Sequence, residues 1–71
     1  MRQTRSASVA ANIRAEMKRQ RIRQPVIAAA LGLSQASVSR KLTGHTPLTV
    51  DELAVVADVL GVDLVELVKA A

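Results

Sequence analysis

The lack of aromatic residues and of cysteine limits what this chain can fold into more than any other feature. Its 71 residues include no Phe, Tyr, Trp or Cys, yet 49% of them are hydrophobic. Without cysteine, neither a disulfide nor a thiolate metal site can stabilise such a short single domain. The core must be aliphatic. Because Ala and Leu favour helices and the β-favouring aromatic residues are missing, we expect an all-α fold.

Charge is distributed unevenly along the sequence. Residues 1–50 carry nine Lys and Arg side chains and one acidic residue, Glu16, whereas residues 51–71 carry five acidic side chains and Lys69. A basic body with an acidic end is the electrostatic outline of a polyanion binder whose acidic end is turned away. Solvated surface charge explains the same asymmetry, so the pattern alone does not select between the two interpretations.

Apolar periodicity predicts a compact bundle of about five short helices. They are expected at about residues 7–21, 24–31, 34–42, 49–60 and 63–69. Ser6 is the predicted N-cap of the first helix, and Pro25 fits the first turn of the second. Gly32 is placed to end the second helix in a left-handed conformation. Alternation typical of strands is nowhere sustained beside turn residues.

The last two helices begin with recognisable capping sequences. Residues 49–52 read T-V-D-E, a capping box in which Thr49 and Glu52 bond reciprocally to each other's backbone. Leu48 and Leu53 flank it as a hydrophobic staple. Asp63 is predicted to cap the last helix in the same way, with Glu66 three residues on and Val62 stapled to Leu67.

The second and third helices are separated by two or three residues, the spacing of a helix-turn-helix, whose second helix enters the DNA major groove. Residues 24–42, QPVIAAALGLSQASVSRKL, resemble the lambda-repressor-like (Cro/CI-type) helix-turn-helix family. The likeness covers about residues 9–68. The residues at the matching positions are Gln24, Ala28, Gly32, Leu33, Ser34 and Val38. The resemblance implies one DNA-binding domain over residues 1–71, with its motif at about 24–42 and a flexible basic arm at 1–6.

Four of these matching residues have structural explanations. Ala28 is small where the two motif helices approach, and Gly32 permits a positive φ. Ser34 can accept a backbone N–H at the start of the third helix, and Val38 anchors that helix. We assign none of the four to DNA.

The outward side of residues 34–42 is small, polar and basic. A helical wheel places Val38 inward, and Gln35 lies in the first turn, which points into the groove in this family. An amide can pair with adenine, Arg40 with guanine or a phosphate, and Ala36 can meet a thymine methyl. The predicted base contacts are Gln35, Ala36, Ser37, Ser39 and Arg40.

Phosphate contacts are expected around this helix. Gln24 begins the second helix, where N–H groups attract anions, and the matching glutamine in the family also supports the one matched by Gln35. Lys41 can extend past Val38 and Leu42 to the DNA backbone. Arg23 departs from the family, which often has a Ser or Thr cap there. The predicted phosphate contacts are Gln24, Arg23, Lys41, Thr43, His45, Thr46, Arg2 and Arg5.

The resulting prediction is a cytoplasmic, sequence-specific double-stranded-DNA-binding domain of a phage- or bacterial-type transcriptional regulator, a repressor. Two partners are left open: a homodimer on a palindromic or repeated site, and a missing C-terminal region, either of which could use Val55, Val59 and Val65. No cofactor, metal or small-molecule ligand is expected with one histidine and no cysteine. The carboxylates are explained as helix-start residues, so we expect no enzyme.

Three alternatives compete with this prediction. The chain could be a protein–protein interaction module of the antitoxin or adaptor type that uses the acidic, Val-rich helices at 49–69. It could bind RNA, although the absence of aromatic residues disfavours stacking on single strands. It could also lie on a membrane through residues 9–23, but these lack Trp, Phe and Leu. No run is long and apolar enough to span a membrane.

Overall fold

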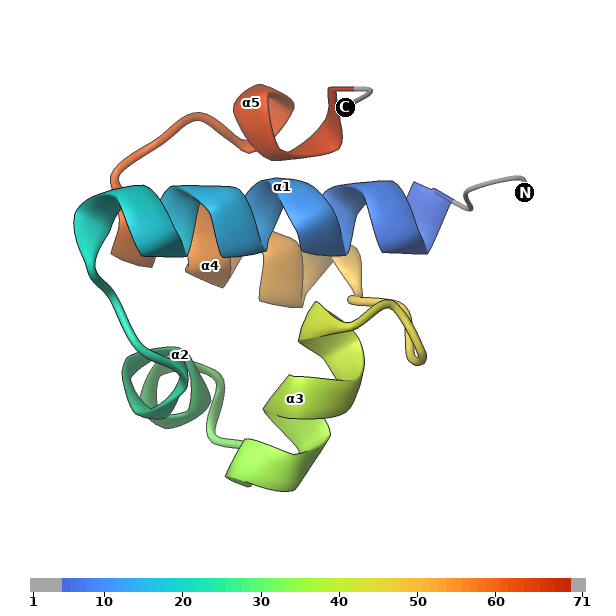
Figure 1. Cartoon of the computed structure of the whole chain (residues 1–71), viewed down its shortest axis with the longest axis vertical. Coiled ribbons are helices and arrows are strands. Elements are labelled where there is room, and N and C mark those ends of the chain that lie inside the picture. The colour runs from blue at the N-terminus through green and yellow to red at the C-terminus, as the bar shows by residue number, and fades with distance from the viewer. Residues whose placement is uncertain (1–4, 70–71) are drawn as a thin grey trace.

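The protein is a helical bundle built around a long first helix. The computed structural model describes residues 5–69, and within that range it contains five helices and no strand (Figure 1). The helices are α1 (Arg5–Gln20), α2 (Gln24–Leu31), α3 (Gln35–Leu42), α4 (Val50–Leu60) and α5 (Leu64–Val68). The prediction of an all-α bundle is confirmed.

The helices are not arranged evenly around α1. Figure 1 shows α5 on one side of α1, with α2 and α3 on the opposite side. α1 packs against α3, α4 and α5, while α2 packs against α3 and α4. The α2–α3 pair therefore forms one end of the molecule and α5 forms the other.

The core is aliphatic, and every helix contributes to it. The largest side chains with almost no exposed surface are Ile13, Ile27, Leu42, Leu67, Val38 and Val56. Burying one such side chain contributes about 1.5–3 kcal/mol, so several together can hold a short chain without aromatic residues. Val59, which the sequence left free for a partner, packs against this core instead.

Most predicted helix ends are confirmed. Gly32 is left-handed (φ 67°), and Leu33 N–H donates to Ala28 O at 3.0 Å. At the start of α4, Glu52 N–H donates to Thr49 Oγ1 at 3.0 Å and Thr49 N–H donates to Glu52 Oε1 at 2.9 Å. The capping box thus fixes the first turn of α4.

Two predicted caps are wrong. α1 begins at Arg5, so Ser6 lies inside its first turn. Ala7 packs there against the loop after α3, where a Cβ on Gly44 would come within 3.0 Å of Ala7 Cα. Asp63 occupies the N-cap of α5, but its side chain makes no capping bond. Its backbone carbonyl accepts from Glu66 N–H at 2.9 Å instead, because α5 is a single short turn.

Polar side chains of α1 bind the C-terminal carbonyls of three other helices. Asn12 Nδ2 donates to Leu67 O of α5 at 2.9 Å, and Gln20 Nε2 donates to Leu60 O of α4 at 2.7 Å. Arg14 donates to the carbonyl of Leu42, the last residue of α3. α1 thereby satisfies acceptors that helix ends leave open. Within the described residues, no helix is long and apolar enough to cross a membrane.

Candidate nucleic-acid interface

α2, a three-residue turn and α3 form the predicted two-helix motif. The turn consists of Gly32, Leu33 and Ser34, and the Ser34 side chain accepts from Ser37 N–H at 3.2 Å to start α3. Ala28 and Val38 both lie in the core, with 6% and 1% of their surfaces exposed. The structural roles predicted for Gly32 and Ser34 of the turn, and for Val38 as the anchor of α3, are therefore confirmed.

All five predicted base-contacting residues lie on α3 and outside the core. Gln35, Ala36 and Arg40 are exposed, whereas Ser37 and Ser39 are half-buried. The Ser37 hydroxyl oxygen lies 3.1 Å from Ser34 Oγ, so it already belongs to the cap. Contact of these residues with bases stays a prediction.

Arg23 and Gln24 stand at the start of α2. Arg23 has the extended N-cap conformation (φ −102°, ψ 162°), but its side chain forms no capping bond. Arg23 is exposed and Gln24 is half-buried. The departure from a Ser or Thr cap therefore leaves the start of α2 without a side-chain cap, with a cation beside it.

An open hollow of about 520 Å³ connects α1 with this motif. Gln24 and Gln35 both line it, and the support of Gln35 by Gln24 that the family resemblance implies stays a prediction. The lining residues are Arg14, Met17, Lys18, Ile22, Arg23, Gln24, Pro25, Gln35 and Leu42. Sequence reasoning missed Arg14 and Lys18 here. Their spacing of four residues, which places two cations on one side of a helix, was the available signal.

The loop after α3 is folded back onto the end of that helix. Thr43 Oγ1 lies 2.9 Å from Ser39 O and 2.8 Å from His45 Nδ1. The backbone N–H groups of His45 and Thr46 both donate to Arg40 O, at 3.0 and 3.3 Å. Three predicted phosphate contacts are thereby held beside Arg40.

Part of the predicted N-terminal arm at residues 1–6 is helical. Arg5 is exposed but helical, so Arg5 and Ser6 belong to α1 and not to an arm. Arg2 lies outside the described residues.

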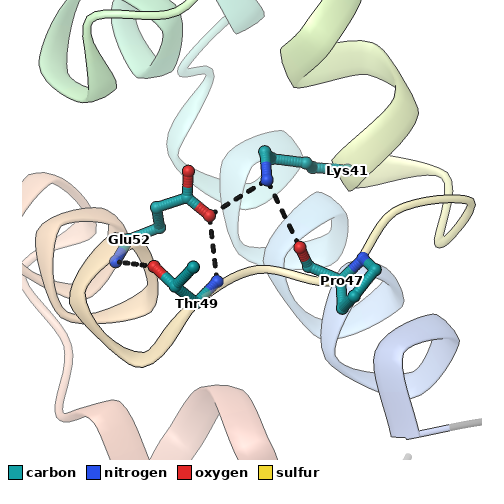
Figure 2. Close-up of polar contacts among 4 residues, drawn as sticks. All are labelled: Lys41, Pro47, Thr49 and Glu52. Atoms are coloured by element: carbon teal, nitrogen blue, oxygen red, sulfur yellow. Dashed lines mark hydrogen bonds and ion pairs between the residues drawn. The ribbon is translucent and has the colours of Figure 1, made fainter.

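Lys41 differs from the other predicted phosphate contacts. Its side chain is 14% exposed, and its ammonium lies 3.0 Å from Glu52 Oε1 and 3.3 Å from Pro47 O (Figure 2). Backbone hydrogen bonding from Thr49, and then the neighbouring Lys41, hold the pKa of Glu52 below its ordinary value. A phosphate contact by Lys41 stays a prediction, but it requires the ammonium to leave these partners.

Most of the basic residues that the structure describes form no ion pair with a carboxylate. Within residues 5–69, ion pairs join Arg19 to Glu16, Lys41 to Glu52 and Lys69 to Glu66. The other cations of that range form no ion pair with a carboxylate, namely Arg5, Arg14, Lys18, Arg21, Arg23 and Arg40. They belong to α1, the segment that follows it, and α3. The positive charge is therefore concentrated in the part of the chain that includes the motif.

Other kinds of site find less support. Among the described residues, no cluster of three or more His, Cys, Asp or Glu is placed to hold a metal ion. Val50, Val65 and Val68 are exposed on α4 and α5, the helices of the alternative interaction module. Nothing in the structure indicates what would cover them.

Comparison with known proteins places the chain in one family. The model of the helix-turn-helix domain family matches residues 2–70, which is nearly the whole chain. No curated protein and no solved structure matches it. The lambda-repressor-like (Cro/CI-type) subclass stays a prediction.

Proposed function

The chain belongs to the helix-turn-helix domain family, and we propose that it is the sequence-specific, double-stranded-DNA-binding domain of a phage- or bacterial-type repressor. In this proposal α3 enters the major groove and Gln35 and Arg40 distinguish base pairs. The family membership supports DNA binding. The assignment to a repressor and the palindromic or repeated site rest on the resemblance of residues 24–42 to Cro/CI-type domains. A cytoplasmic location is part of the same proposal.

One observation carries the proposal, namely the two-sided character of α3. Its inward side is anchored by Val38 and Leu42, each 1% exposed, while its outward side bears small polar residues and Arg40. Small side chains let a helix approach the floor of a groove, and longer amide and guanidinium groups reach base edges. A helix selected only for packing has no need of that combination.

The unpaired cations supply the second part of the proposal. Arg14, Lys18 and Arg23 surround the hollow between α1 and the motif. Neutralising about 4–6 phosphates would give a slope of about −4 to −5 for log K against log salt concentration. Affinity is thus expected to fall steeply with salt, while the base preference persists.

The test is selection from random duplex DNA at low salt, with the wild type, Gln35→Ala and Arg40→Ala. Each variant is expected to lose about 1–3 kcal/mol of discrimination, about 5- to 150-fold, at the bases that it reads. Lys69→Ala is the matched control, because it removes one exposed cation beyond α5.

Two results would count against the proposal. If Gln35→Ala and Arg40→Ala both kept the wild-type preference, α3 would not be the recognition helix. If the wild type bound no duplex above background, the interaction module formed by α4 and α5 would become the better explanation.

A further inference from the structure

The two cations of α3 have different surroundings. Arg40 is exposed and forms no ion pair with a described carboxylate. Lys41 is 14% exposed, and its ammonium contacts Glu52 Oε1 at 3.0 Å and Pro47 O at 3.3 Å. Its charge is therefore directed toward the body of the protein, to a carboxylate whose side chain is 21% exposed.

Glu52 is fixed independently of Lys41. Its Oε1 also accepts from Thr49 N–H at 2.9 Å, and its own N–H donates to Thr49 Oγ1 at 3.0 Å. A carboxylate in the first turn of a helix is further stabilised by the helix dipole. Figure 2 shows one Glu52 oxygen bonded both to the capping box of α4 and to the lysine of α3.

The C-terminal end of α3 is held from two directions. Lys41 ties it to α4, and Arg14 of α1 donates to the carbonyl of Leu42. Both links join α3 to helices outside the two-helix motif. The angle at which α3 projects from the bundle therefore depends on contacts beyond α2 and the turn.

We propose that Lys41 is a positioning residue and not a phosphate ligand, and that its pair with Glu52 sets the angle at which α3 meets the major groove. Glu52, a residue of α4, then contributes to base selection without touching DNA. The inference rests on the proposed function, since it assumes that α3 reads bases. It also replaces the expectation that Lys41 contacts a phosphate.

Salt dependence separates the two roles. A lysine that neutralises a phosphate adds about 0.9 to the steepness of log K against log salt concentration, because it releases a counterion. A lysine that stays on Glu52 adds nothing to that slope. Its removal should instead disturb the geometry of α3, which lowers discrimination between similar sites.

The experiment compares Lys41→Met and Glu52→Gln with the wild type. Methionine keeps an unbranched apolar stem, and glutamine can still serve in a capping box. Affinity is measured over a range of salt concentrations for the selected duplex and for one with a single altered base pair. Circular dichroism confirms that each variant is folded under the assay conditions. Arg23→Gln is the control for an exposed cation at the motif.

For Lys41→Met we expect the wild-type salt slope, whereas Arg23→Gln should flatten the slope by about 0.9. Both Lys41→Met and Glu52→Gln should reduce discrimination by a similar factor, about three- to tenfold, and the double variant should lose no more than either alone. A purely structural role would lower the unfolding midpoint and leave discrimination by the folded protein unchanged.

The inference is overturned if Lys41→Met flattens the slope by about 0.9 with discrimination intact, or if Glu52→Gln leaves discrimination unchanged. A wild type that shows no preference among duplexes contradicts the proposed function itself. That failure is visible before any variant is compared.

Discussion

α3 and α5 are both short helices with a buried leucine, yet their outward sides are opposite in character. Leu42 anchors α3 and Leu67 anchors α5, with 1% and 2% of their surfaces exposed. The outward side of α3 bears small polar residues and Arg40. α5 exposes Val65 and Val68, at 58% and 42%, beside Glu66.

The difference shows how the uneven charge along the sequence becomes uneven charge in space. α3 and α5 lie on opposite sides of α1 (Figure 1). A groove lined by phosphates favours cations and small polar groups, and it disfavours carboxylates and exposed branched apolar side chains. What distinguishes the two helices is thus the surface that each presents, because both are anchored in the same core.

The largest expected effect tests whether Leu42 and Leu67 contribute equally to the free energy of unfolding. Leu42→Ala and Leu67→Ala should each lower the free energy of unfolding by about 2–5 kcal/mol, because each removes a fully buried side chain. Urea denaturation at low temperature measures both. A loss below about 1 kcal/mol for Leu67→Ala would mean that α5 is only loosely attached and that the comparison with α3 fails.

A smaller effect should distinguish the N-cap of α3 from the N-cap of α5, because only the former is expected to add much to stability. Ser34 accepts from Ser37 N–H, whereas the Asp63 side chain makes no capping bond. Ser34→Ala should therefore cost about 1 kcal/mol of unfolding free energy. Asp63→Ala should cost only about 0.3 kcal/mol, through the helix dipole. Equal losses in thermal melts would show that Asp63 caps α5 in solution.

The smallest effect concerns how the free energy of unfolding depends on pH. It compares the Lys41–Glu52 pair of α3 and α4 with the Lys69–Glu66 pair at α5. The pKa of Glu52 is lowered in the folded state, so its contribution is present above the unfolded value, near 4.5, and is lost as pH falls through the folded value. Glu52→Gln should flatten the decline of the unfolding free energy in this acid range.

Glu66→Gln is the matched control for the pH experiment. Its partner Lys69 is 61% exposed and Glu66 itself is 54% exposed, so solvent screens the pair and little stability is expected from it. If Glu66→Gln flattened the acid decline as much as Glu52→Gln, the link between α3 and α4 would contribute no more to stability than the exposed pair at α5.

Local signals in the sequence predicted the bounds of α2 and the capping box at Thr49 and Glu52, because those features depend on neighbouring residues. The resemblance to Cro/CI-type domains placed Gln24 near Gln35. The contacts that sequence reasoning missed join distant residues. Asn12, Arg14 and Gln20 bind carbonyls 55, 28 and 40 positions away. Every residue has a backbone carbonyl, so the sequence does not show which carbonyl will accept such a bond. These links are therefore seen only in the folded chain.

The same reason explains what the sequence does not show at single residues. Ser6 is a good N-cap by type, but it lies inside α1, where the next residue, Ala7, packs against Gly44. The phosphate contact expected of Lys41, which would extend past Val38 and Leu42, stays a prediction. What the sequence does not reveal is that its ammonium meets Glu52, eleven residues on.

The contrast between α3 and α5 can be decided by titrating the selected duplex into the isotope-labelled protein and following its backbone amide NMR signals. We predict that the shifted amides cluster in α3, at Arg23 and Gln24, and in the loop at Thr43 and His45, with little change in α5. Shifts concentrated in α4 and α5, with α3 unaffected, would contradict the assignment of α3 as the DNA-reading helix.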